Sequence, residues 1–438
     1  MRKTMKVSAL AVVGAMALYV VLGAQGASAP KYLYDPGWPK PLPNKWKLGG
    51  VTGLAVAPDD DTVWVYDRPN DLTNLELEAE TGTSDCCARP PSMIHFDHSG
   101  AVIGSFDAPQ GHGMDIDSKG FAFLGQNTVR KYDSKTGKLI GEVPHTPELE
   151  NGGTFGPAET PKHTPGVGGM GPVFGFLPPP PGLARGGRGG RGGGEAPDPA
   201  AQAAARAAFR KKYPPTTPMI VGGIEEIRLD EPANEVYVAD NYLGGRIMVF
   251  DMNTFAFKRG WGAYGHKLSE ISTNDADRRF VGTTPPKEFM AHLTLNISND
   301  GLVYAADRNA DRIHVTKKDG TFVKEFVINP PGTKRGEGND RGTSGGVAFS
   351  ADKEQRYLVI SDIKNNTIWF LNRQDGKVVG RLGSMGESGG QFFGLHMIAT
   401  DTKGDIYTGE VFAGQRVQRF VPAESPRGKL LEQLARTQ

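Results

Sequence analysis

The chain has 438 residues and a formal net charge of +1, with 50 Lys and Arg against 49 Asp and Glu. A charge so close to neutral gives no electrostatic basis for binding nucleic acid or an anionic membrane surface. Only two cysteines are present, which excludes a disulfide framework. The 59 glycines and 32 prolines are typical of many short strands joined by tight turns, together with some disorder.

The first 29 residues are predicted to be an export signal. Three basic residues among the first six precede an apolar, uncharged run from Val7 to Ala24, and small residues follow up to Ala29. The run is also nearly long enough to span a bilayer, so an uncleaved N-terminal anchor is the alternative. In both cases we expect an exported protein, periplasmic or secreted, whose membrane contact is confined to this segment.

The two cysteines, Cys86 and Cys87, are adjacent. A bond between them would close a small ring, which is possible in an oxidising compartment. The alternative is a pair of loop thiols without a structural role.

Six similar units follow one another between residues 45 and 423, and each reads as strand, turn, strand, turn, strand. Their first strands begin at Gly53, His112, Ile224, His292, Gly346 and His396. Turns rich in Asp, Asn, Gly and Lys separate the strands, as hairpins require. A fourth strand follows several units, and units of four strands at a spacing of about 40 residues are typical of propeller blades. We therefore predict an all-β fold, a six-bladed β-propeller of NHL-type repeats, which Trp46 to Gly50 would close.

One region interrupts the repeats, from about Pro147 to Pro218. It contains Pro178 to Pro181, an Arg-Gly-Gly run from Arg185 to Arg191, and an Ala-rich run from Ala200 to Ala208. This composition cannot bury enough apolar surface to fold alone, so we predict a disordered insertion between units two and three. The Ala-rich run could form a short helix, and residues 424–438 are expected to be a C-terminal tail.

Three units of the six begin their first strand with a histidine: His112 in unit two, His292 in unit four and His396 in unit six. First strands line the channel of a propeller, and alternate blades of a six-fold ring lie about 120° apart. The three imidazoles are therefore expected to converge on the axis and to hold one metal ion with an open position. Zinc suits three neutral imidazoles, although copper, nickel or iron could also bind.

The other histidines are interpreted as ordinary polar residues of strands and turns. A lone histidine at a strand start usually has no more than that role, and only the shared repeat position sets the three above apart. The ordinary set is His95, His98, His145, His163, His266 and His314.

A second group of polar residues follows the second strand of three units, on the face where the first strands begin. The chain places Arg68 after unit one's second strand, Tyr242 after unit three's and Arg308 after unit four's. The two arginines could bind a carboxylate bidentately, and a tyrosine near a metal could act as a base. The alternative is that these residues only close the tops of the blades through salt bridges.

These residues resemble those of a known enzyme family. The stretch from Ala306 to Ile313, together with the segment from Asp240 to Ile247, resembles the catalytic core of the peptidyl-α-hydroxyglycine α-amidating lyases, which is also a six-bladed propeller. The resemblance covers roughly residues 45 to 423 apart from the insertion. It implies that zinc binds His112, His292 and His396, that Tyr242 is catalytic, and that Arg68 and Arg308 are the active-site arginines.

The chain also departs from this family in three respects. The aspartate that follows the third histidine and helps to bind a structural calcium is replaced by Met397, which puts a calcium ion in doubt. The disulfides of the animal enzymes have no counterpart. The partner monooxygenase domain that makes the hydroxyglycine substrate is absent, so the physiological substrate stays open.

We therefore expect a monomeric, metal-dependent lyase that cleaves the C–N bond of a peptidyl-α-hydroxyglycine, a small-molecule or peptide C-terminal substrate, to an amide and glyoxylate. One alternative is another propeller enzyme, such as a streptogramin-type lyase or a gluconolactonase-type lactonase, although lactonase sites use acidic and amide ligands. The other is a non-catalytic NHL-repeat binding protein. Propellers host many functions, so the fold alone does not decide among the three.

Overall fold

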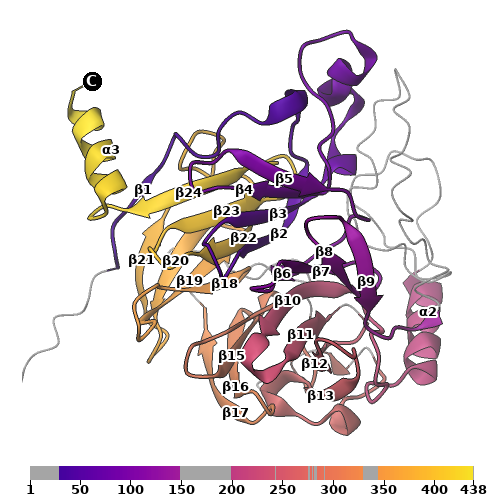
Figure 1. Ribbon diagram of the computed structural model, residues 1–438. Coiled ribbons are helices and arrows are strands. Elements are labelled where there is room, and N and C mark those ends of the chain that lie inside the picture. The colour runs from indigo at the N-terminus through magenta and orange to yellow at the C-terminus, as the bar shows by residue number, and fades with distance from the viewer. Residues whose placement is uncertain are drawn as a thin grey trace, which may run out of the picture.

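The chain forms a six-bladed β-propeller. The computed structural model describes residues 29–147, 199–241, 243–274, 277–278, 280, 284–290, 292–328 and 344–437. Within these residues the strands form six antiparallel sheets of four strands each, arranged in a ring (Figure 1). The prediction of an all-β propeller with six repeats is confirmed.

Five blades are made of four strands that are consecutive in the chain. Blade one contains β2 (Gly50–Val56), β3 (Val63–Arg68), β4 (Met93–Phe96) and β5 (Val102–Phe106). Blade two contains β6 (Met114–Ile116), β7 (Phe121–Gly125), β8 (Val129–Asp133) and β9 (Lys138–Glu142). Blade three contains β10 (Ile224–Asp230), β11 (Glu235–Asp240), β12 (Arg246–Asp251) and β13 (Phe257–Trp261). Blade four contains β14 (Leu293–Ile297), β15 (Leu302–Asp307), β16 (Arg312–Lys317) and β17 (Phe322–Val327). Blade five contains β18 (Val347–Phe349), β19 (Tyr357–Asp362), β20 (Thr367–Asn372) and β21 (Val378–Leu382).

Blade six joins the two ends of the described chain. Its strands are β22 (Leu395–Thr400), β23 (Ile406–Glu410), β24 (Val417–Pro422) and β1 (Tyr32–Tyr34), and β1 pairs antiparallel with β24. The strand that closes the ring is therefore Tyr32–Tyr34 and not the segment from Trp46 to Gly50. Gly50 instead begins the innermost strand of blade one, and Trp46 makes an isolated bridge to Ala88.

The first strand of every blade lies toward the middle of the ring, because β2, β6, β10, β14, β18 and β22 contact their counterparts in neighbouring blades. The hydrophobic core lies between the blades. Trp64 and Tyr66 of blade one, for example, pack with Met114 and Leu124 of blade two. Each sheet is packed between its neighbours, so every residue of the second strands β3, β11 and β19 is buried.

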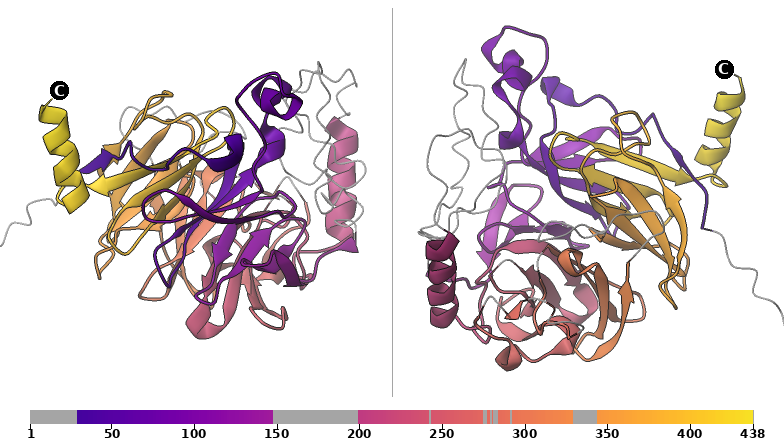
Figure 2. Two further views of the ribbon diagram at one scale, coloured as in Figure 1. Left: turned by 45° about the horizontal axis from the view of Figure 1, so that its top comes forward. Right: turned by 180° about the vertical axis from the view of Figure 1, so that it is seen from behind.

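The C-terminal residues form a helix that covers the closing strand. Helix α3 (Pro426–Arg436) begins at Ser425, whose hydroxyl accepts a hydrogen bond from the backbone N–H of Gly428. It lies against β1 and β24 on the outside of the ring (Figures 1 and 2). The carboxylate of Asp35, just after β1, accepts hydrogen bonds from Arg427 at 2.5 Å and from Arg419 at 2.5 Å.

Closure at Asp35 is expected to depend on pH. Burial favours the neutral form of this carboxyl, but the hydrogen bonds from Arg427 and Arg419 outweigh it and lower the pKa of Asp35 to about 2. A group with a lowered folded-state pKa stabilises the fold above its unfolded pKa, about 4, and loses that contribution as the pH falls toward 2. We expect Asp35→Asn to cost about 2 kcal/mol at pH 7 and to remove this pH dependence, as measured by urea unfolding at pH 7, 4 and 3. The exposed Asp59→Asn should show neither effect, and equal losses in the two variants would contradict the assignment.

Part of the predicted insertion packs on the propeller. Helix α2 (Pro199–Lys212) contains the Ala-rich run, and Phe209 near its end is buried against Val221. Arg210, only 2% exposed, pairs with Glu288 at 2.6 Å. The segment from Pro214 to Pro218 is held by the buried guanidinium of Arg246, which donates to the Thr217 carbonyl at 2.9 Å. Residues 199–218 therefore belong to the fold, whereas residues 148–198 lie outside the described part.

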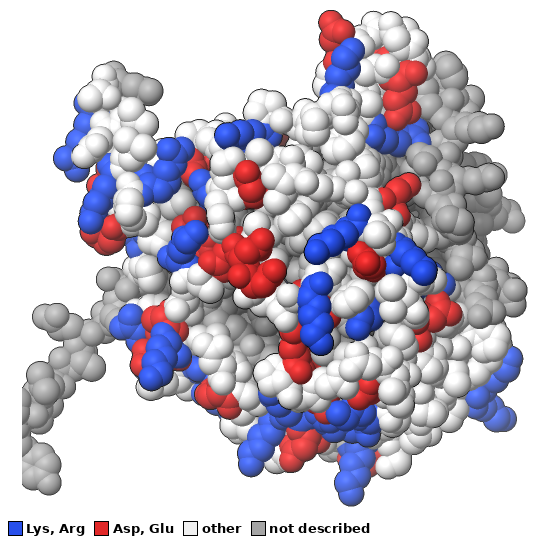
Figure 3. Space-filling model, viewed as in Figure 1, with Lys and Arg blue, Asp and Glu red and all other residues white. Residues whose placement is uncertain are grey.

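The structure describes the cysteine pair and the surface charge, but not the N-terminal segment. The export signal lies outside the described residues, except for Ala29. Among the residues that the structure describes, no helix is both long and apolar enough to cross a bilayer. Cys86 and Cys87 are joined by a disulfide in the loop between β3 and β4. Figure 3 shows basic and acidic side chains interspersed over the face seen in Figure 1, without a broad area of one sign.

Candidate metal centre

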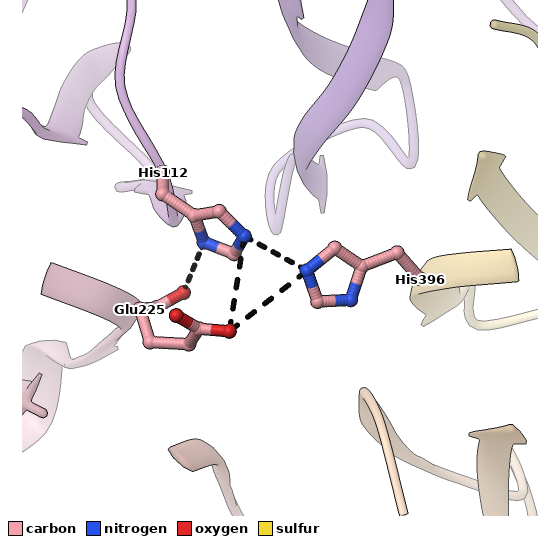
Figure 4. A group of neighbouring side chains, drawn as sticks. All are labelled: His112, Glu225 and His396. Carbon is pink, nitrogen blue, oxygen red and sulfur yellow. Dashed lines mark hydrogen bonds and ion pairs between the residues drawn. The ribbon is translucent and has the colours of Figure 1, made fainter. Parts of the chain in front are cut away.

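Three side chains from three blades meet in the middle of the propeller. His112 precedes β6 in blade two, Glu225 lies in β10 of blade three, and His396 lies in β22 of blade six. One donor atom from each lies within 4.8 Å of the others, and all three residues are buried. Figure 4 shows the two imidazole rings facing each other through their Nε2 atoms, 2.8 Å apart, with the carboxylate of Glu225 beside them.

The third predicted ligand, His292 of blade four, reaches the same carboxylate. Its Nδ1 lies 3.2 Å from Oε1 of Glu225, while the Nε2 atoms of His112 and His396 lie 4.0 Å and 3.9 Å from that oxygen. The His292 side chain is 19% exposed, so it is more open to solvent than the other two. The histidines of blades two, four and six thus all face one carboxylate oxygen, as their shared repeat position predicts.

Irregular strand pairing explains how two of these side chains turn into the channel. The pairing of β10 with β11 shifts register between Ile224 and Ile227, around Glu225. The pairing of β22 with β23 shifts between Leu395 and Met397, at His396. A bulge adds a residue to one strand and re-aims its side chain. His292 is also unusual, because its backbone has a φ of 55°, in the region that a residue with a bulky side chain rarely adopts.

Close packing of the backbone positions His112. It lies between Gly111 and Gly113, and Gly113 has a φ of 79°. A Cβ atom on Gly113 would come within 2.8 Å of the Cα of Glu226, and one on Gly111 within 1.9 Å of the Gly125 carbonyl oxygen. Both positions therefore require glycine, which brings blade two against β10. The hydroxyl of Thr52 also donates to the Gly111 carbonyl at 2.8 Å.

The hydrogen bonding of His112 prepares it to bind a metal. Its Nδ1 lies 2.6 Å from the backbone carbonyl oxygen of Glu225. A carbonyl can only accept, so Nδ1 carries the proton and Nε2 presents a lone pair toward His396. A histidine whose second nitrogen donates to a carbonyl is the usual arrangement at metal centres, because the hydrogen bond fixes both the tautomer and the ring orientation.

The charge states of the group also suit a cation. Burial lowers the pKa of His112 to about 4, and burial together with the charge of His112 holds the pKa of His396 well below its usual value. Both imidazoles are therefore neutral at neutral pH, the form that binds metals. Burial opposes ionisation of Glu225, but His112 and His292 outweigh it and hold the pKa of this carboxyl well below its usual range. The site therefore offers neutral nitrogens and one negative charge.

These donors fit a divalent metal ion. Imidazole nitrogens and a carboxylate oxygen are ligands that zinc accepts in catalytic sites. Two nitrogens bound to one tetrahedral zinc would be about 3.3 Å apart. The rings of His112 and His396, 2.8 Å apart between their Nε2 atoms, would therefore separate by about half an ångström around an ion. Nδ1 of His396 is buried and has no hydrogen-bond partner among the described residues, so no hydrogen bond through Nδ1 holds this ring in place.

Both predicted arginines lie within electrostatic reach of the histidines. The charge of Arg68 contributes to the lowered pKa of His112, and the charge of Arg308 contributes to that of His396. Arg68 is buried and pairs with Asp71 at 2.8 Å. Arg308 is half-buried, and its backbone N–H lies 3.4 Å from the carbonyl oxygen of His292. The positive charges of both arginines therefore act on the histidines of the candidate site.

The predicted base, Tyr242, lies outside the described residues, and the loop on either side of it is described. Asp240 ends β11, pairs with Arg246 at 2.9 Å and accepts a hydrogen bond from the Gly222 N–H at 2.6 Å. The backbone N–H of Asn241 donates to the Gly223 carbonyl at 2.9 Å. Asn241 thus lies beside the start of β10, the strand that carries Glu225.

Glu225 is the residue of this group that the sequence analysis did not single out. A signal was present, because Glu225 and Glu226 are consecutive acidic residues in a strand expected to line the channel. Two adjacent carboxylates in such a position are costly to bury unless they have partners. Met397, where the lyase family has a calcium-binding aspartate, is 2% exposed and packs in an apolar cluster with Val51 and Tyr407.

Comparisons with other proteins add little to this description. No protein-family model and no curated protein matches the chain. Among solved structures, a structural-genomics protein of unknown function from Bacteroides thetaiotaomicron is similar, with a TM-score of 0.45 and 14% identity over 86% of this chain and 70% of that one. The propeller assignment therefore rests on the strand topology, and any statement of function rests on the residues of the candidate metal centre.

Proposed function

We propose that the protein is a metal-dependent lyase, with zinc as the expected metal, that converts a peptidyl-α-hydroxyglycine to a peptide amide and glyoxylate. The observation that carries this proposal is the convergence of His112, His292 and His396 on one oxygen of Glu225. These histidines are the residues that match the zinc ligands of the amidating lyases. Histidines at the same position of alternate blades converge whatever their origin, so what supports the lyase is that the converging residues are also those that match the family's zinc ligands.

The arginines fit the carboxylate of such a substrate. The positive charge of Arg68, in blade one, acts on His112, and that of Arg308, in blade four, acts on His396. A guanidinium can bind a carboxylate through two parallel hydrogen bonds, and Asp71 holds that of Arg68 in place. A substrate with a carboxylate one carbon from the hydroxyl would place the hydroxyl at the histidines.

The reaction needs one base and no redox partner. A divalent ion at the histidines would act as a Lewis acid toward the substrate hydroxyl and lower its pKa. Tyr242 takes the hydroxyl proton, and the O–H electrons form the C=O bond of glyoxylate as the C–N bond breaks. The C–N electron pair stays on nitrogen, which receives the proton and becomes a primary amide. Arg68 and Arg308 hold the glyoxylate carboxylate throughout.

A lactonase-type hydrolase is the second candidate, and Glu225 is the observation that favours it. The sites of these propeller enzymes use acidic ligands, and a buried carboxylate is part of the present group. Three histidines facing that carboxylate favour the lyase. A substrate panel separates the two candidates.

The test is glyoxylate release from an N-acyl-α-hydroxyglycine by the purified, zinc-loaded protein. We expect stoichiometric amounts of amide and glyoxylate, loss of activity after treatment with a chelator, and recovery when zinc is added. A simple γ- or δ-lactone offered to the same preparation should not be hydrolysed. Hydrolysis of the lactone without glyoxylate release would replace the lyase by the second candidate. Inactivity toward both substrate classes in metal-loaded protein would refute the proposed reaction.

A further inference from the structure

Two buried asparagines have side chains that bind nothing within the described residues. Asn127 lies in the turn between β7 and β8 of blade two, and Asn241 follows β11 of blade three. Their exposures are 1% and 0%. The amide oxygen and the amide nitrogen of each lack a hydrogen-bond partner in the part of the chain that the structure describes.

Both asparagines lie at the end of the blade where the metal centre is. The N–H of His112 donates at 2.7 Å to the carbonyl of Gly125, two residues before Asn127. The N–H of Asn241 donates at 2.9 Å to the carbonyl of Gly223, two residues before Glu225. The two turns belong to adjacent blades, and Gly125 packs against Ile224, the neighbour of Glu225.

Asn241 also occupies a repeat position with a proposed binding role in other blades. It directly follows Asp240, the last residue of its blade's second strand. Arg308 follows Asp307 in the same way in blade four, and Arg68 ends the second strand of blade one directly after Asp67. The position that presents a guanidinium in blades one and four therefore presents a carboxamide in blade three.

Buried amides without hydrogen-bond partners lower the stability of a fold, so their presence at two positions calls for an explanation. A buried polar group without a partner destabilises a fold, because its hydrogen bonds to water are lost on folding and are not replaced. An asparagine in the corresponding turn of blade five is paired: Oδ1 of Asn366 accepts from the N–H groups of Gly394 at 2.7 Å and Leu395 at 3.2 Å. Asn366 therefore has a structural role, whereas the amides of Asn127 and Asn241 have no such partner in the described part of the chain.

We propose that Asn127 and Asn241 form a subsite for the amide portion of the ligand. A carboxamide presents one acceptor and two donors, which complement the C=O and N–H of a peptide amide group. The arginines suit a carboxylate and the histidines suit a metal, so the asparagines supply the recognition that neither of these provides. The claim that this amide belongs to a peptidyl-α-hydroxyglycine rests on the proposed function. The claim that the subsite binds a peptide C-terminal amide does not.

Binding measurements on the metal-loaded protein test the subsite without turnover. The probes are N-acetylphenylalanine amide, which carries amide groups only, and glycolate, which carries only the hydroxyl and the carboxylate. In Asn127→Leu and Asn241→Leu we expect the Kd of the amide to rise about tenfold or more, because hydrogen bonds are lost, and that of glycolate to stay within about twofold. The melting temperature should stay level or rise, because leucine has a similar size and leaves no unpaired amide.

A matched control distinguishes binding from structure. The amide nitrogen of Asn296 in β14 donates to the Val347 carbonyl at 2.9 Å, so Asn296→Leu should lower the melting temperature and leave amide binding unchanged. The subsite is refuted if wild-type protein does not bind the amide, or if the two leucine variants melt lower and bind the amide as tightly as wild type. Amide binding that is lost in both variants, in a protein that releases no glyoxylate, would uphold the subsite and refute the lyase.

Discussion

Replacing His396 by alanine is expected to leave the purified protein with almost no bound metal. His396 is buried and contributes a neutral nitrogen 2.8 Å from that of His112. Without this ring, two imidazoles and one carboxylate remain as possible ligands. Even substitutions of residues that only hydrogen-bond to a metal ligand lower the metal affinity by about 10- to 100-fold. We therefore expect a loss of at least about a hundredfold, measured as metal per chain after dialysis and by competition with a chelator.

His112→Ala and His292→Ala should behave in the same way, and His266→Ala is the matched control. His266 is on the surface, 2.8 Å from Glu270 and far from the channel strands in sequence, so its removal should leave metal content unchanged. Glu225→Gln keeps the size of the side chain and removes its charge, so it should bind metal more weakly than wild type. One tightly bound ion per chain in a His112→Ala, His292→Ala double variant would contradict the site.

The repeats and the convergence of the histidines were predictable because they depend on register. The first strand of a blade recurs at a fixed place in the repeat, and His112, His292 and His396 all stand at its start. Equivalent positions in alternate blades are brought together by the symmetry of the ring, whatever the details of packing. The convergence of these three histidines can therefore be predicted from the sequence.

Glu225 was not predictable in the same way, because a bulge decides where its side chain points. Period-2 alternation assigns Glu225 and Glu226 to opposite faces of β10, but the register shift between Ile224 and Ile227 breaks that alternation. The sequence also does not reveal that the amides of Asn127 and Asn241 lack hydrogen-bond partners, because the partners of a side chain depend on its surroundings in the folded protein. A buried asparagine with partners, such as Asn366, looks the same in sequence.

The closing strand and the end of the insertion differ from the sequence prediction for another reason. The strand Tyr32–Tyr34 has three residues, too few to show any periodicity, and its partner β24 lies at the other end of the chain. Composition identified the insertion, but it does not reveal single anchoring residues. Phe209 and Arg210 attach the end of α2 to the propeller, although the Ala-rich run around them has little apolar surface to bury.

Replacing Tyr242 by phenylalanine is expected to separate catalysis from binding. The change removes one hydroxyl and keeps the ring, while the metal ligands and both arginines stay in place. If this hydroxyl accepts the substrate proton, kcat should fall by about 10² to 10⁴-fold with KM nearly unchanged, because the lost interaction matters mainly in the transition state. Full activity in Tyr242→Phe would remove the tyrosine from the mechanism.

An arginine variant provides the opposite pattern, and the structure decides which arginine to change. Removing Arg68 would leave the buried Asp71 without its ion-pair partner. Burial raises the pKa of Asp71 to about 6 even though the charge of Arg68 opposes this, so Arg68→Ala risks misfolding. Arg308 is half-buried and begins a short turn, so Arg308→Ala is the safer choice. We expect KM to rise by about 10- to 100-fold, since a charge-assisted hydrogen bond to the substrate carboxylate is worth about 1.5–3 kcal/mol. Both variants are measured by steady-state kinetics of glyoxylate release. If KM rose in Tyr242→Phe as much as in Arg308→Ala, the tyrosine would bind substrate and would not accept its proton.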